Sequence, residues 1–81
     1  MKEQIKSQLR RFFDDQLQLC EYYVWEQDMT LANAIWQQAV GVAIFVSIYA
    51  LDFGFSDEIS AMWNKEYKGA FDKVLHREVG E

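Results

Sequence analysis

The only histidine, His76, follows Asp72 by four residues, so the two side chains share a face if this stretch is helical. An acid and an imidazole at that spacing can form an ion pair or offer two ligands to a metal ion. A zinc site needs about four protein ligands, or three and a water molecule, and no set of that size is in view in the sequence. We therefore expect a surface charge pair at this position and no bound metal.

The only cysteine, Cys20, falls on the apolar side of a predicted helix. A nucleophilic thiol needs a histidine or another positive group nearby to favour the thiolate, and the neighbouring Glu21 does the opposite. One cysteine cannot form a disulfide within the chain, and the charged first residues do not resemble a signal peptide. We therefore expect Cys20 to be a small core residue of a reduced, cytoplasmic protein.

Carboxylates are plentiful, but their spacing does not suit acid–base catalysis. Asp14 and Asp15 are adjacent, so a helix points them about a quarter-turn apart instead of into one cleft. The sequence also has no glycine-rich phosphate loop, no Ser-His-Asp set and no calcium-binding loop. We predict that the protein is not an enzyme and uses no cofactor.

Composition narrows the class of protein further. The 81 residues carry a formal charge of −5, which disfavours binding to nucleic acid, because such binders usually present a basic patch. Apolar residues make up 51% of the chain and aromatic residues 16%, which excludes a disordered chain. We expect one folded domain over residues 1–81.

Apolar residues recur at intervals of three and four along three segments, a pattern that predicts helices at about 2–27, 31–52 and 57–77. The fold class is therefore all-α: a helical hairpin plus a third helix in a three-helix bundle. The last residues, from Val79, are expected to fray.

Residue types at the breaks support these boundaries. Asp28 or Thr30 can cap the second helix, and Gly54 suits the left-handed position after its end. Ser56 suits the cap of the third helix, whose first turn is acidic, and Arg77 near its end complements the helix dipole.

The second segment is the most informative, because it carries no charged residue from Met29 to Leu51. A helix that is apolar all round is normally buried. The β-branched residues alternate between Val40 and Ile48, which by itself is typical of a strand. No other segment has a strand pattern to pair with it, so we favour the helix.

Three environments can cover such a helix. A bilayer needs about 20 apolar residues, but the purely apolar run covers only Ala39 to Leu51. Asn33 and Gln37 lie in the remaining part, and no basic residue flanks either end, so a membrane span is disfavoured. A monomeric bundle would expose an apolar strip, which monomers rarely do. An oligomer, with a two-fold dimer as its commonest form, covers the helix best.

The second helix has two rows of side chains at intervals of about four. Ala39, Ala43 and Ser47 form a row of small residues, and bulkier residues form a neighbouring row. One row can face the chain's own helices while the other faces a second copy. The predicted interface comprises Trp36, Ala39, Val40, Ala43, Ile44, Ser47, Ile48 and Leu51.

These observations favour a small, non-enzymatic protein-interaction domain that self-associates as a homodimer through its central helix. One alternative is an acidic inhibitor that imitates nucleic acid in a basic groove of a partner enzyme, because acids follow the second half of the first helix. Another alternative is a small membrane-associated protein.

Overall fold

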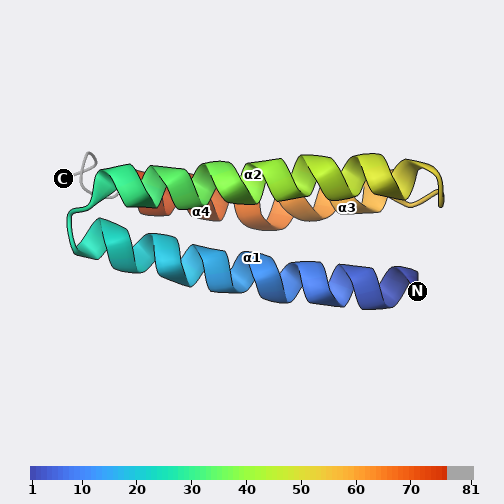
Figure 1. Ribbon diagram of the computed structural model, residues 1–81, viewed down its shortest axis with the longest axis horizontal. Coiled ribbons are helices and arrows are strands. Elements are labelled where there is room, and N and C mark those ends of the chain that lie inside the picture. The colour runs from blue at the N-terminus through green and yellow to red at the C-terminus, as the bar shows by residue number, and fades with distance from the viewer. Residues whose placement is uncertain (77–81) are drawn as a thin grey trace.

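The computed structural model describes residues 1–76 as three helical rods that run alternately up and down (Figure 1). The first two rods are α1 (Lys2–Trp25) and α2 (Met29–Leu51). The third consists of α3 (Ser56–Met62), a π-helical segment η1 (Trp63–Tyr67) and α4 (Lys68–Leu75). The bundle measures 42 × 17 × 16 Å.

The predicted all-α class is confirmed, and the strand considered for residues 40–48 is wrong, because that stretch lies inside α2. A helix satisfies its backbone donors and acceptors internally, whereas a strand here would lack a partner. The predicted helix end at residue 77, the role given to Arg77 and the fraying from Val79 lie outside the described residues.

The helix ends follow local chemistry, with one correction. The Asp28 carboxylate accepts a hydrogen bond from the backbone N–H of Leu31 at 3.2 Å, which confirms it as the cap of α2. Gly54 has a φ of 81°, a left-handed conformation that glycine adopts without strain. The cap predicted at Ser56 is wrong: Phe55 occupies the cap position without a side-chain hydrogen bond, and Ser56 is the first residue of α3.

The core is built from small residues on α2 and large residues on the other two rods. The buried residues of α2 are four alanines, Ala32, Ala39, Ala43 and Ala50. The largest fully buried side chains come from the other rods: Phe13 and Cys20 from α1, Ile59 from α3 and Phe71 from α4. Short alanine side chains let the neighbouring rods pack closely on α2, so the small row predicted from the sequence faces the chain itself.

Polar contacts hold α1 on the third rod. The phenol of Tyr67 donates a 2.8 Å hydrogen bond to the Asp14 carboxylate, and its ring centroid lies 5.0 Å from that of Phe13. Burial, reinforced by this contact with Asp14, raises the pKa of Tyr67 to about 12. Three ion pairs lie toward the start of α1: Lys2 and Lys6 with Glu58, and Arg10 with Glu66.

The third rod changes its helical repeat at η1. Its buried positions step by three from Ile59 to Met62, then by five to Tyr67, and by four to Phe71. A five-residue step would rotate Tyr67 out of the core in a regular α-helix, and one π turn restores it. The same turn sets Trp63 and Asn64 beside α2.

Candidate interaction surface

The outer face of α2 carries a strip of large apolar side chains that the other described residues leave uncovered. Each of the six is between 46% and 70% exposed, and Phe45 is the most exposed. The rings of Tyr49 and Phe53 contact each other with centroids 5.1 Å apart, which joins the loop after α2 to the helix. The apolar strip consists of Ile44, Phe45, Ile48, Tyr49, Leu51 and Phe53.

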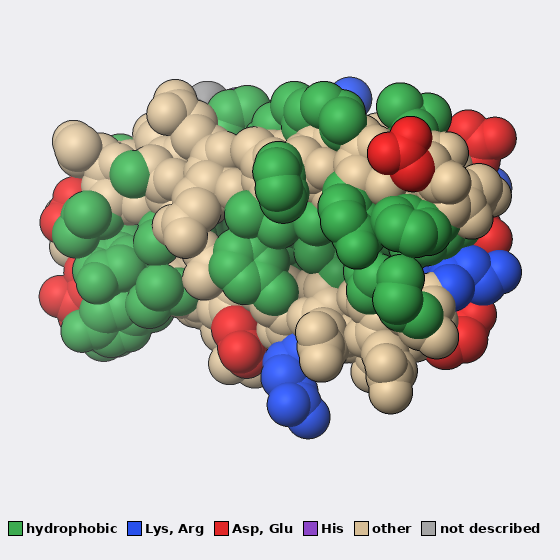
Figure 2. Space-filling view, turned by 45° about the vertical axis from the view of Figure 1, so that its right-hand side comes forward, with side chains coloured by type: hydrophobic (Ala, Val, Ile, Leu, Met, Phe, Trp, Pro, Cys, Tyr) green, Lys and Arg blue, Asp and Glu red, His purple; other side chains and the backbone are tan. Residues whose placement is uncertain are grey.

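The apolar strip is large for a protein of this size. Taking about 200 Å² for one fully exposed large side chain, its six members present about 700 Å². The largest apolar patch on a typical monomer is about 300–600 Å², and a standard protein–protein interface takes about 800 Å² from each partner. In Figure 2, hydrophobic side chains gather across the middle of one face, with charged groups mostly at its margins.

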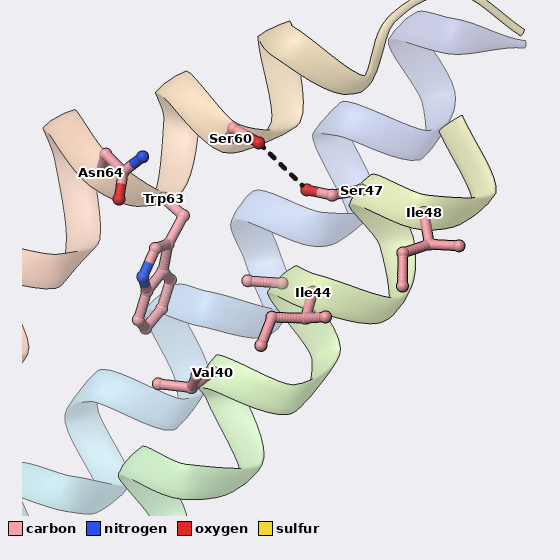
Figure 3. Close-up of a pocket in the computed structure, with 8 residues that line it drawn as sticks. Val40, Ile44, Ser47, Ile48, Ser60, Trp63 and Asn64 are labelled. Atoms are coloured by element: carbon pink, nitrogen blue, oxygen red, sulfur yellow. Dashed lines mark hydrogen bonds between the residues drawn. The ribbon is translucent and has the colours of Figure 1, made fainter. Parts of the chain in front are cut away.

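One edge of the apolar strip descends into a groove of about 270 Å³ between α2 and the third rod (Figure 3). The Trp63 ring stands between the two helices, and the hydroxyls of Ser47 and Ser60 lie 3.3 Å apart across the groove. These hydroxyls hydrogen-bond each other, and the remaining walls of the groove are mainly apolar. It is lined by Val40, Ala43, Ile44, Ser47 and Ile48 from α2, and by Ser60, Trp63 and Asn64 from the third rod.

The eight residues predicted as an interface divide into three groups. Ala39 and Ala43 are buried within the chain. Trp36, Val40 and Ser47 are half-buried, and the indole Nε1 of Trp36 is enclosed without a hydrogen-bond partner. The remaining three, Ile44, Ile48 and Leu51, are exposed on the apolar strip.

The predicted set omitted the aromatic part of the surface. Phe45, Tyr49 and Phe53 are all about half exposed or more. Phe45 and Tyr49 directly follow Ile44 and Ile48 in the sequence, so they widen the same helical face. An uncharged helix gives no amphipathic phase, and therefore only the packing of α1 and the third rod reveals which side of α2 is outside.

The residues first considered for chemistry lie apart from this surface. Cys20 is fully buried, its Sγ contacts the carbonyl of Ala32 at 3.5 Å, and burial, followed by the nearby charge of Glu21, raises the pKa of its thiol. The charge pair predicted for Asp72 and His76 is wrong, because the Nδ1 of His76 lies 2.9 Å from the backbone carbonyl of Asp72. The same carbonyl also accepts the backbone N–H of His76 at 3.1 Å.

No group of three or more His, Cys, Asp or Glu side chains within residues 1–76 is placed to hold a metal ion. Over the same residues, α2 is the one helix with the length and composition to cross a membrane, a property that core helices share. Within the chain, 17% of its most apolar window is buried.

Compared with protein-family models, curated protein sequences and solved structures, the chain shows no match.

Proposed function

We propose that this protein is a non-enzymatic interaction domain that forms a homodimer through the outer face of α2. The observation that carries the proposal is the apolar strip, which presents about 700 Å² of surface when about 200 Å² is allowed for each fully exposed side chain. That area is close to one partner's share of a standard interface. A second copy that covers the strip removes the free-energy cost of exposing apolar surface to water from both molecules, because a two-fold interface uses the same patch on each.

The first half of α2 favours a second copy over a lipid bilayer. Its outer face exposes Thr30, Asn33, Gln37 and Gln38, whose amides and hydroxyl would have to enter the hydrocarbon if α2 crossed a membrane. Burying such groups without hydrogen-bond partners is costly. In a dimer they can bond to each other or remain in water at the edge of the interface.

The alternative of an acidic inhibitor has less support. Glu58 and Glu66 pair with basic residues of α1, and Asp14 and Asp28 accept hydrogen bonds within the chain. Carboxylates that are already engaged contribute less to attraction by a basic partner. These four acids are therefore less available to a basic partner than carboxylates without contacts.

The proposal is tested by measuring the solution mass with light scattering over a tenfold range of concentration, without detergent. The wild-type protein is expected to be a dimer. Ile48→Glu places a charge in the middle of the apolar strip and is expected to give a monomer with unchanged helix content. An unpaired buried charge is costly enough to prevent association.

Leu31→Glu is the matched control, because Leu31 is also exposed on α2 but lies in the first turn, away from the apolar strip. It makes the same change in charge and is expected to leave the dimer intact. A monomeric wild-type protein would refute the homodimer. A wild-type protein that stays in solution only with detergent or lipid would also refute it and would favour the membrane alternative.

A further inference from the structure

We propose that the groove beside α2 receives the Phe45 ring of a second copy, reciprocally, in a dimer whose α2 helices run parallel. This inference rests on the homodimer proposed as the function, and it names the residue that each copy contributes to the other. Its support comes from the size of the groove, the position of Phe45 and an unexplained glycine.

The groove suits one side chain better than a small-molecule ligand. Its volume is about 270 Å³, whereas pockets for small molecules usually measure about 300–1,000 Å³. Its walls are the aliphatic side chains of Val40 and Ile44 and the ring of Trp63, which favour an aromatic occupant (Figure 3). Nothing within the described chain fills it.

Phe45 is the side chain that projects most from the same surface, with 70% of its area exposed. With 3.6 residues per turn, Gly41 and Ile48 lie along the centre line of the outer face of α2. Ile44 falls on one side of that line, toward the groove, and Phe45 falls on the other side. A projecting ring and an apolar groove therefore flank the same line.

Symmetry then selects the direction of the helices. In a two-fold pair with parallel helices, opposite edges of the two faces meet, and each residue lies level with its own counterpart. Phe45 then faces the partner's groove at the right height, because the groove spans residues 40–48 of α2. In an antiparallel pair, like edges meet, so groove would face groove. The parallel pair also brings Gln37 and Gln38 level with the same amides of the second copy.

Gly41 is accounted for by this arrangement. A glycine inside a helix costs about 1 kcal/mol relative to alanine, and a Cβ built at Gly41 would meet nothing within 4 Å. No contact within the described residues explains why this position lacks a side chain. In the parallel pair, Gly41 lies opposite its counterpart, where the absence of a Cβ lets the two backbones approach closely.

The test uses two variants that each spoil one half of the contact. Phe45→Ala removes the ring, and Asn64→Trp fills the groove from its exposed rim. Each variant alone is expected to weaken the homodimer by more than tenfold, as measured by sedimentation equilibrium. Circular dichroism checks that each variant keeps its helix content.

Mixing the two variants is the decisive step. In the heterodimer, Phe45 of the Asn64→Trp copy still enters the open groove of the Phe45→Ala copy, so one contact stays intact. At the other contact, the copy without the ring faces the filled groove. The affinity of the heterodimer is expected to exceed the geometric mean of the two homodimers at least tenfold. If like edges met instead, as in an antiparallel pair, the affinity of the heterodimer would equal that mean.

A second measurement tests the direction of the helices independently. Ile48→Cys lies on the centre line, so mild oxidation is expected to join two parallel copies through this residue, while the buried Cys20 stays reduced. A wild-type dimer with neither heterodimer gain nor this disulfide would overturn the parallel arrangement and leave the homodimer standing. A monomeric wild-type protein would overturn both.

Discussion

Replacing Tyr67 with phenylalanine removes one hydroxyl from the seam between α1 and the third rod. That hydroxyl donates to the Asp14 carboxylate at 2.8 Å and approaches the Arg10 carbonyl at 3.3 Å. A hydrogen bond to a charged group contributes about 1.5–3 kcal/mol. Asp14 is exposed and regains water in the variant, so we expect a loss near the middle of that range, about 2 kcal/mol at neutral pH.

The same change should alter how stability depends on pH. Tyr67 has a pKa of about 12 in the folded protein, against 10.0 for an ordinary tyrosine. Between these values the folded state holds a proton that the unfolded state has lost, so stability is full below pH 10 and falls as the pH rises through 12. A difference of that size corresponds to about 3 kcal/mol. The gap of about 2 kcal/mol between wild type and Tyr67→Phe should therefore close near pH 12.

Urea denaturation followed by circular dichroism, at one protein concentration and at several values between pH 7 and pH 12, measures this gap. Contributions from the other titrating groups cancel in the difference between the two proteins. Tyr22→Phe is the control, since Tyr22 is exposed, and it should match the wild type throughout. A gap for Tyr67→Phe that stays constant to pH 12 would refute the assignment of the raised pKa to this hydroxyl.

Three further substitutions test the cap of α2 and the glycines of α2 and α4. Asp28→Ala removes the cap that Leu31 donates to and should lower the free energy of unfolding by about 1 kcal/mol; unchanged stability in urea would contradict the capping role. Gly41 and Gly69 are both helical with open space beside them. Gly69→Ala should therefore stabilise the protein by about 0.5–1 kcal/mol and leave its oligomeric state unchanged. Gly41→Ala should instead weaken the dimer at least tenfold in sedimentation, and equal behaviour of the two variants would argue against close approach at Gly41.

Features that depend on neighbours within one helical turn could be read from the sequence. The periodic apolar residues placed three helical rods, and the boundaries of α1 and α2 differ from the expected ones by at most two residues. The cap at Asp28 follows from its carboxylate, and the turn at Gly54 follows from the absence of a side chain there. The cap was misassigned to Ser56 because the buried Phe55 takes the cap position, and α3 begins at Ser56, one residue earlier than expected.

The π turn at η1 could not be read from the sequence, because it depends on tertiary contacts. Trp63 stands four residues before Tyr67, so the apolar residues keep a regular helical spacing in the sequence and hide the five-residue step between the buried Met62 and Tyr67. Tyr67 is buried against α1, where its ring contacts that of Phe13 and its hydroxyl donates to the Asp14 carboxylate. The energy of those contacts with α1 outweighs the poorer geometry of a π turn.

The sequence by itself determined that α2 is an uncharged helix with more apolar surface than two neighbouring rods can cover, because charge and helical period are local properties. It left open which side of α2 would stay outside, since a helix that is apolar all round has no preferred face. Only the tertiary structure decided this: the alanine row lies inward, where short side chains permit close packing of the rods. Phe45 and Ile48 therefore remain on the surface.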